Sequence, residues 1–146
     1  SYLPRRVALL GDSGWHARLA TDPSALDAAI AEGLRVTTPS PVMLRAVTAP
    51  TRIGGVAVRP GDRVILGTYW ADTALGAFDP EANPAASLKQ LWFGAGAHYC
   101  LGARLAMAQI RLALDALLAH PRLAITRRAS ARGVLIPSYA RLEVRA

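Results

Sequence analysis

The sequence is poor in cysteine, with Cys100 alone in 146 residues. One cysteine excludes an internal disulfide framework and favours a reducing compartment, so we expect a cytoplasmic protein. Consecutive apolar residues form only short runs, which excludes a membrane-spanning helix. Hydrophobic residues nevertheless make up 52% of the chain, enough for the core of one domain or of part of one.

Acidic residues are also few: 10 Asp and Glu residues stand against 17 Lys and Arg residues, which gives a net charge of +7 at pH 7. All but one of the basic residues are arginines, and they are scattered along the chain. A nucleic-acid surface is typically a basic stripe with interleaved aromatic residues. The hypothesis of a nucleic-acid-binding module therefore rests on net charge alone, and we expect no nucleic-acid partner.

The chain has no initiator methionine, since it begins Ser-Tyr-Leu-Pro. It also lacks the charged head, apolar run and small-residue cleavage site of a signal peptide. We therefore expect a fragment of a longer protein or a processed chain.

Two helices are predicted near the N-terminus. Residues 15–20 can form a short helix capped by Asp12 or Ser13. Ser24 is a candidate N-cap for a second helix over residues 25–35, which the two prolines of residues 37–41 end. Three apolar residues at helical spacing predict the buried stripe of this second helix: Leu26, Ile30 and Leu34.

Residues 42–70 are predicted to form strands. The Pro60-Gly61 turn between residues 56–58 and 63–69 predicts a hairpin, because proline presets the turn and glycine accepts a positive φ. Residues 71–92 show no regular pattern, and a loop of that length is often functional.

A glycine-rich loop at residues 93–102 leads into an Ala/Leu-rich helix over residues 103–119. This helix has apolar residues on more than one face, so we expect it to be buried on most sides. His120-Pro121 ends it, and three short strand candidates follow, at residues 123–126, 133–136 and 141–144.

Cys100 is the candidate functional residue of the glycine-rich loop. A helix N-terminus offers unpaired N–H groups and a partial positive charge, which favour a thiolate over a thiol. Glycines at positions 94, 96 and 102 let the backbone approach a flat ligand closely. A thiolate held in this way is suited to bind haem iron.

Other interpretations of Cys100 stay open at this point. A lone cysteine is most often a small buried apolar residue, and a redox sensor or a nucleophilic hydrolase would also use one. A hydrolase needs a base, for which the chain offers His16, His98 and His120. A c-type haem would need Cys-x-x-Cys-His, and a zinc site would need more ligands.

The loop resembles the haem-binding signature of the cytochrome P-450 family. The family pattern is Phe-Gly-x-Gly-x-His-x-Cys-x-Gly-x-x-Leu-Ala, and every fixed position is filled here, from Phe93 to Ala106. Glu32-Gly33-Leu34-Arg35 resembles the family's Glu-x-x-Arg helix. Residues 41–45, followed by Gly54-Gly55, resemble the segment in which an arginine reaches a haem propionate before a strand hairpin.

The resemblance implies a fold class and a set of roles. The fold would be mainly α with small β-sheets (α+β), the C-terminal part of the P-450 fold of the soluble bacterial type. Cys100 would be the axial thiolate ligand of haem b (iron protoporphyrin IX) and the catalytic residue. The other haem-binding residues would be Arg45 and His98 at the propionates, Phe93 beside the sulfur, and Gly94, Gly96 and Gly102 in the loop.

The family also implies partners. Residues 37–44 would line part of the pocket for a small organic substrate. Arg104 and Arg111 would lie near the proximal face, where positive charge can steer a ferredoxin-type electron donor. Both arginines can equally belong to an ordinary solvated helix face.

The sequence departs from the family pattern in three respects. The long central helix with its acid–threonine pair, the N-terminal sheet and the helices above the haem are absent. No arginine lies between Arg63 and Arg104, where the family supplies a third member to the Glu-x-x-Arg pair, and Asn83 or Lys89 can substitute. Gln109 stands where a glutamate often follows the signature.

We therefore expect residues 1–146 to be the C-terminal haem-ligand portion of a P-450 domain. Its parent would be a monooxygenase that inserts one atom of O2 into an organic substrate with electrons from a redox partner, and the chain alone a poor enzyme. The alternative is a catalytically silent P-450-like haem-binding or accessory protein, or a truncated gene product.

Overall fold

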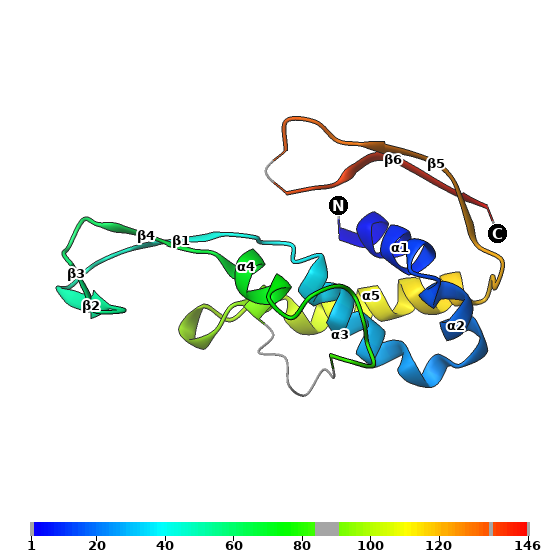
Figure 1. The fold of residues 1–146 in the computed structure, drawn as a ribbon, viewed down its shortest axis with the longest axis horizontal. Helices are drawn as coiled ribbons and strands as arrows, with labels where there is room; N and C mark the ends of the chain where they lie inside the picture. The colour runs from blue at the N-terminus through cyan, green and yellow to red at the C-terminus, as the bar shows by residue number, and fades with distance from the viewer. Residues whose placement is uncertain (1, 84–90, 135, 146) are drawn as a thin grey trace.

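The computed structural model describes residues 2–83, 91–134 and 136–145, and in these ranges the chain is mainly helical with small two-stranded sheets. The helices are α1 (Tyr2–Asp12), α2 (Trp15–Thr21), α3 (Leu26–Val36), α4 (Thr68–Thr73) and α5 (Ala103–Leu118). The strands are β1 (Met43–Ala46), β2 (Thr51–Ile53), β3 (Val56–Val58), β4 (Arg63–Leu66), β5 (Ala124–Ser130) and β6 (Tyr139–Arg145). Figure 1 shows the helices in one body, with β1 to β4 extending from it and the β5–β6 hairpin beside α1. The expected fold class is confirmed.

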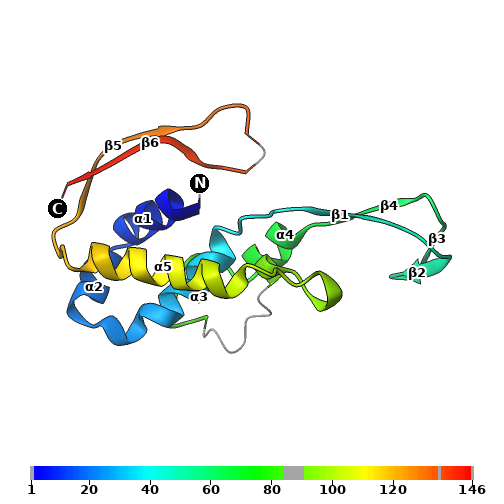
Figure 2. The ribbon, with the colours of Figure 1, turned by 180° about the vertical axis from the view of Figure 1, so that it is seen from behind.

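The core lies between α2, α3 and α5. The predicted stripe of α3, Leu26, Ile30 and Leu34, is at most 2% exposed, and it belongs to one apolar cluster with Ile110 and Leu114 of α5. Burying each such side chain contributes roughly 1.5–3 kcal/mol, so this stripe fixes α3 in the body. Figure 2, which shows the molecule from the opposite side, shows α5 running along the same helical body.

Helix α1 was not predicted from the sequence. Pro4 lies in its first turn, where a missing N–H removes no hydrogen bond from the helix. Arg6 is fully buried and donates to the carbonyl oxygens of Ala29 at 3.1 Å and Ile30 at 2.6 Å. A buried guanidinium thus joins α1 to α3, and such a contact between helices leaves no trace in local sequence periodicity.

The predicted helix caps at Asp12, Ser13 and Ser24 are wrong. Helix α2 follows Gly14, which adopts a left-handed φ of 74°, and no side chain caps it. The glycine reverses the chain between α1 and α2 by itself. Before α3, the cap belongs to Asp22, whose carboxylate accepts a hydrogen bond of 3.0 Å from the backbone N–H of Ser24.

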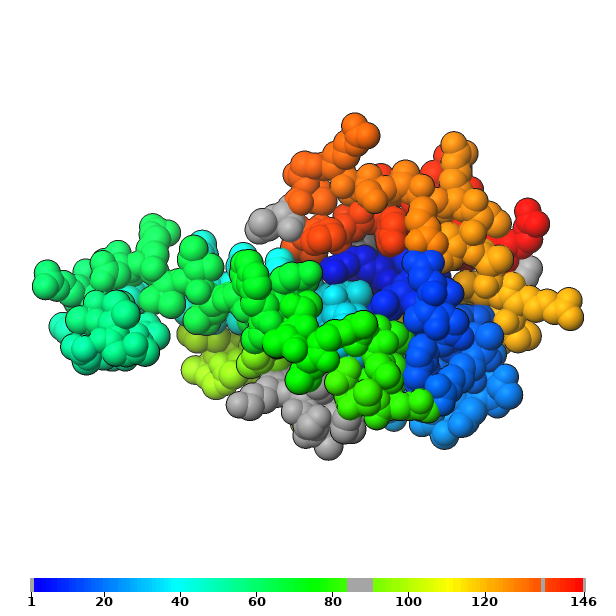
Figure 3. Space-filling view, viewed as in Figure 1, coloured from blue at the N-terminus to red at the C-terminus, as the bar shows by residue number. Residues whose placement is uncertain are grey.

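The strands pair differently from the prediction. A turn does form at Pro60-Gly61, where the N–H of Asp62 donates to the Arg59 carbonyl at 3.0 Å. However, β3 pairs with β2 across Gly54-Gly55, and β4 pairs with β1, so the predicted hairpin is wrong. The turn therefore joins two separate sheets, which together form the arm (residues 43–66) that projects from the body in Figure 3.

The prediction that the α5 region is buried on most sides is also wrong. Only Ala103, Ile110 and Leu114 of α5 are buried, whereas Leu105 is 63% and Leu112 71% exposed. One face of α5 contacts the core, and none of the described elements covers the opposite face.

The C-terminal hairpin contains two of the three predicted strands. Residues 123–126 and 141–144 fall largely within β5 and β6, which pair antiparallel. The third candidate is wrong: Gly133, Val134 and Ile136 lie in the connection, and Leu135 falls outside the described residues. Within the described ranges, none of the helices is long and apolar enough to cross a membrane.

Candidate functional site

The glycine-rich loop folds back on itself so that its two ends meet. The N–H of Cys100 donates to the Phe93 carbonyl at 2.8 Å, and the N–H of Tyr99 donates to the Gly96 carbonyl at 3.1 Å. Gly94 and Gly96 have φ values of 72° and 62°, which a side chain would strain. A Cβ on Gly94 would also lie 3.1 Å from the His98 carbonyl oxygen. The loop conformation therefore requires glycine at these positions.

Cys100 is a free, exposed cysteine close to the start of α5. Its carbonyl accepts the N–H of Ala103 at 3.2 Å, which continues the chain into the helix. A Cβ on Gly102 would lie 3.9 Å from the sulfur, an ordinary van der Waals distance, so Gly102 is adjacent to Sγ. No three His, Cys, Asp or Glu side chains of the described residues come together, so these residues offer no multi-ligand metal site at Cys100.

A cavity of about 710 Å³ opens beside the sulfur. Its wall is mostly apolar and comes from α1, the segment after α3, the glycine-rich loop and α5. Four predicted site residues line it: Phe93, Gly94, His98 and Cys100. Gly96 and Gly102 shape the loop but are not part of the cavity wall.

Arg45 does not line this cavity. It lies half-buried on β1, and its guanidinium donates to the neighbouring Leu44 carbonyl at 3.0 Å. Met43, two residues earlier on the same strand, does line the cavity. Because side chains alternate along a strand, Met43 and Arg45 point to the same face, so Arg45 lies on the cavity side of β1 but farther along the arm.

The predicted pocket segment, residues 37–44, is divided. Pro39, Ser40 and Met43 line the cavity, whereas Thr37 and Thr38 are buried and are not part of its wall. Residues 37–42 thus connect α3 of the helical body to the arm, which begins at Met43.

Sequence analysis missed several residues of the cavity wall. Ala106, the last signature residue, lines it from α5 together with Gln109 and Ile110. Gln109 and Ile110 follow Ala106 by three and four positions, and this spacing, which places all three on one helix face, could have predicted them. Trp92 was also missed: it is 5% exposed, and its indole N–H has no hydrogen-bond partner among the described residues. It lines both the large cavity and a smaller one of about 300 Å³ behind it.

The predicted Glu32–Arg35 pair is the most connected polar group of the described chain. Both side chains are at most 1% exposed, and Arg35 donates to the Glu32 carboxylate at 2.7 and 2.6 Å. Arg35 also donates to the carbonyl of Asp72 and, at 3.0 Å each, to those of Gly76 and Ala77. The pair therefore ties α3 to the chain that follows α4.

Asn83 contacts the Glu32–Arg35 pair directly. Its side-chain amide donates to Glu32 at 2.9 Å, and the N–H of Asp79 donates to the same carboxylate at 3.0 Å. Of the two substitutes considered from the sequence, Asn83 is thus confirmed as a partner of Glu32, and Lys89 falls outside the described residues. A neutral amide replaces a guanidinium, so only Arg35 brings a positive charge to Glu32 within this network.

Two buried carboxyls of this region shift in opposite directions. Burial acts to raise the pKa of Glu32, but hydrogen bonds from Arg35, Asp79 and Asn83 outweigh it, so its pKa is lowered from 4.5. Asp72 has fewer donors to its carboxyl, and Oδ2 is buried with no partner among the described residues. Burial raises the pKa of Asp72 to about 6, despite the Thr38 hydroxyl and the nearby charge of Arg35, which both act to lower it.

The two arginines expected on the proximal face differ. Arg104 is exposed and lines the smaller cavity with Tyr99 and Phe93. Arg111 forms an ion pair with Asp27 of α3 and so has a partner within the chain. Of the two, Arg104 is the better placed to meet a partner.

Two histidines are distant from Cys100. His16 is buried and its Nε2 donates to the Leu117 carbonyl at 3.2 Å, and His120 follows the last turn of α5. A helix of 16 residues is about 24 Å long, so both lie at the opposite end of α5 from Cys100. They cannot act as the base of a nucleophilic cysteine, which leaves His98 as the one candidate among the three histidines.

Comparison with known proteins agrees with this site. The family model for cytochrome P-450 matches residues 22–132, which include the Glu32–Arg35 pair and the whole loop. The chain is 38% identical to the C-19 steroid 1alpha-hydroxylase of Sorangium cellulosum, over 77% of this chain and 30% of that protein. It is 36% identical to the erythromycin C-12 hydroxylase of Saccharopolyspora erythraea, over 69% of this chain and 27% of that protein.

Solved structures show the same fold. A mutant of P-450 EryK in complex with erythromycin B superimposes with a TM-score of 0.83 and 29% identity, covering 98% of this chain and 39% of that chain. P-450 BioI in complex with an acyl carrier protein gives 0.83 and 26%, with the same coverage. The chain thus spans less than a third of the length of these curated relatives. P-450 proteins carry a haem whose iron is bound by a cysteine thiolate, and on the family match, the shared fold and the filled signature the chain belongs to the cytochrome P-450 family.

Proposed function

We propose that residues 1–146 form the C-terminal haem-ligand portion of a haem-thiolate monooxygenase. The parent enzyme inserts one atom of O2 into a small organic substrate with electrons from a ferredoxin-type donor. The observation that carries this proposal is the position of Cys100, a single sulfur donor at the wall of an apolar cavity of about 710 Å³. The lone cysteine also supports a cytoplasmic location.

The residues present fit haem b. The cavity volume lies in the range of sites that bind cofactors, and its wall is mostly apolar with a few polar groups. Gly94 has no Cβ, and one would lie 3.1 Å from the His98 carbonyl oxygen, so glycine permits the tight loop that carries the sulfur. When bound, the haem supplies the one-electron and O2 chemistry.

Each of the following site residues has a defined task in this proposal. The Cys100 thiolate would hold the iron as its sulfur ligand and would donate electron density to it. Phe93, which is buried, excludes water from the side of the loop facing the core. His98 and Arg45 anchor the two propionates by charge-assisted hydrogen bonds, His98 from the cavity wall and Arg45 from the same face of β1 as Met43.

The partners follow from charge and from the relatives. Arg104 is an exposed cation near the Cys100 loop, which suits an acidic electron donor. The relatives are named for hydroxylating steroids and erythromycin, which supports hydroxylation of an organic substrate by the parent of this chain.

A catalytically silent haem-binding protein is the second candidate. The exposed apolar face of α5, with Leu105 and Leu112, favours it for the chain by itself, because an active enzyme would cover such a face. We therefore expect haem binding by the isolated chain but little turnover.

The test is a spectrum of the purified chain after addition of haem, reduction and exposure to carbon monoxide. We expect the long-wavelength Soret band typical of thiolate ligation. Cys100→Ser should lose this band, whereas His120→Ala, at the far end of α5, should keep it. A band that survives in Cys100→Ser, or its absence from the unmodified chain, would contradict the proposed site.

A further inference from the structure

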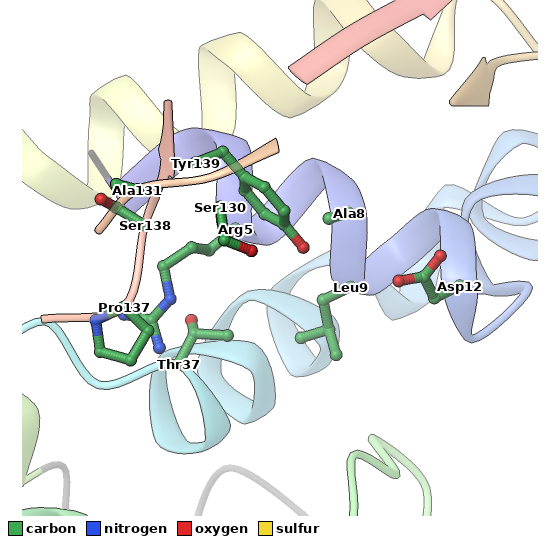
Figure 4. A pocket seen from close by; sticks show the side chains of 10 residues that line it. All are labelled: Arg5, Ala8, Leu9, Asp12, Thr37, Ser130, Ala131, Pro137, Ser138 and Tyr139. Carbon is green, nitrogen blue, oxygen red and sulfur yellow. The ribbon is translucent and has the colours of Figure 1, made fainter. Parts of the chain in front are cut away.

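A second cavity lies on the other side of the segment that follows α3. Its volume is about 320 Å³, and it is lined by α1, by Thr37 and by the two ends of the β5–β6 connection (Figure 4). It shares none of its lining residues with the larger cavity beside Cys100. It is therefore a separate site that the proposed haem chemistry does not use.

Arg5 is the cation of this cavity. Figure 4 shows its side chain extending from α1 toward Thr37 and Pro137. Its one hydrogen bond among the described residues is long, 3.4 Å to the Thr38 carbonyl, and no described carboxylate forms an ion pair with it. Partial burial lowers the pKa of Arg5, because removal from water disfavours the charged guanidinium. A partly desolvated, always protonated donor fork is thus left without an anion.

The carboxylate at the other end of the cavity is already neutralised. Both oxygens of Asp12 accept hydrogen bonds from Arg128 of β5, at 2.8 and 2.7 Å. These hydrogen bonds lower the pKa of Asp12. The Asp12–Arg128 pair carries no net charge, so Arg5 gives the cavity an uncompensated positive charge.

The remaining wall narrows the ligand class. Ser130, Ser138 and Tyr139 add hydroxyl groups, and Ala8, Leu9 and Pro137 add apolar surface. One guanidinium fork matches two oxygens of a carboxylate or of a phosphate, and the single uncompensated charge of Arg5 balances the single charge of a carboxylate. We propose that this cavity binds the carboxylate of a small organic acid, with the Arg5 guanidinium as its anchor.

The position of this site gives it a connection to the larger cavity. An acid that engages Arg5 competes with the long hydrogen bond to Thr38, and the next residues, Pro39 and Ser40, line the larger cavity. The two cavities also share α1 as a wall, through Tyr2 and Leu3 on one side and Arg5 on the other. The proposal itself does not require haem to be bound.

The test is a titration of the ¹⁵N-labelled chain with benzoate, followed by amide chemical shifts. Benzamide, which has the same shape without the charge, is the matched ligand control. We expect saturable benzoate shifts at residues 130–131 and 138–139, binding at least about tenfold weaker for benzamide, and weakening with salt. Arg5→Gln should lose benzoate binding by a similar factor, and Arg59→Gln, an exposed arginine on the arm, should not.

Arg5→Lys separates charge from geometry, because lysine keeps the positive charge but loses the planar fork. We expect intermediate binding for this variant. Equal binding of benzoate and benzamide to the unmodified chain overturns the proposal without any variant. Unchanged benzoate binding in a folded Arg5→Gln chain, shifts outside the cavity, or no saturable binding overturns it as well.

Discussion

Removing the charge of Glu32 is the sharpest test of the network that holds α3. Glu32 is fully buried and accepts four hydrogen bonds, two from Arg35 and one each from Asp79 and Asn83. Glu32→Gln keeps the shape of the side chain but leaves the buried guanidinium of Arg35 without its counter-charge. The carbonyls of Asp72, Gly76 and Ala77 still accept from Arg35, but dipoles replace a charge only in part.

The expected loss follows from the burial. Breaking a buried ion pair by removing one partner costs about 3–5 kcal/mol, whereas a whole domain is stable by only about 5–15 kcal/mol. With a urea dependence of about 1–3 kcal/mol per molar, the midpoint of unfolding should fall by roughly 2 M. The variant should therefore keep only a small free energy of unfolding.

The measurement is urea unfolding followed by far-ultraviolet circular dichroism. Asp27→Asn is the matched control, because Asp27 of the same helix pairs with Arg111 at the surface and should lose at most about 1 kcal/mol. Removing both charges in Glu32→Gln/Arg35→Gln should cost less than the sum of the single changes. If Glu32→Gln loses no more stability than Asp27→Asn, the charge balance described here is wrong.

Three further changes probe the same body. Gly33→Ala should lose about 2 kcal/mol or more of stability in urea unfolding, although alanine favours helix. The reason is that its Cβ would overlap Nη1 of the buried Arg6, so equal or higher stability would contradict the packing. Asp72→Asn should raise the melting temperature at pH 7 but not at pH 3. Because the pKa of Asp72 is raised by folding, the stability of the unmodified chain falls as pH rises from 3.8 through about 6, by on the order of 3 kcal/mol. An effect of the substitution that does not depend on pH would refute this. Asn83→Ala should cost about 1–3 kcal/mol, the value of a hydrogen bond to a buried carboxylate, and a neutral result would show that Asn83 does not support Glu32.

The parts of the fold that follow local chemistry were predictable. The stripe of α3 has helical spacing, and its burial follows from that spacing alone. The glycine-rich loop and the start of α5 were predicted from glycines that accept the positive φ values found there, and part of the loop lines the cavity.

The parts that depend on distant contacts were not predictable from local patterns. The Pro60-Gly61 turn does form, but a turn signal shows where the chain reverses and not which strands pair. Strands β1 and β4 pair although about 20 residues separate them in the sequence. Helix α1 depends on Arg6 reaching the carbonyls of α3. Arg45 was placed by resemblance, and the structure puts it on the cavity side of β1 without bringing it to the cavity wall.

The arm leaves and rejoins the helical body at one point. Thr68 donates to the Ser40 carbonyl at 2.6 Å, and the N–H of Tyr69 donates to the Pro41 carbonyl at 3.0 Å. The two ends of the arm are thus tied together before the chain continues to Asp72, whose carbonyl accepts from Arg35. Doubling the length of a loop closed in this way costs only about 0.6 kcal/mol. Evolution can therefore lengthen, shorten or replace the arm without disturbing the buried network beneath it, which makes this excursion a natural place for members of one family to diverge.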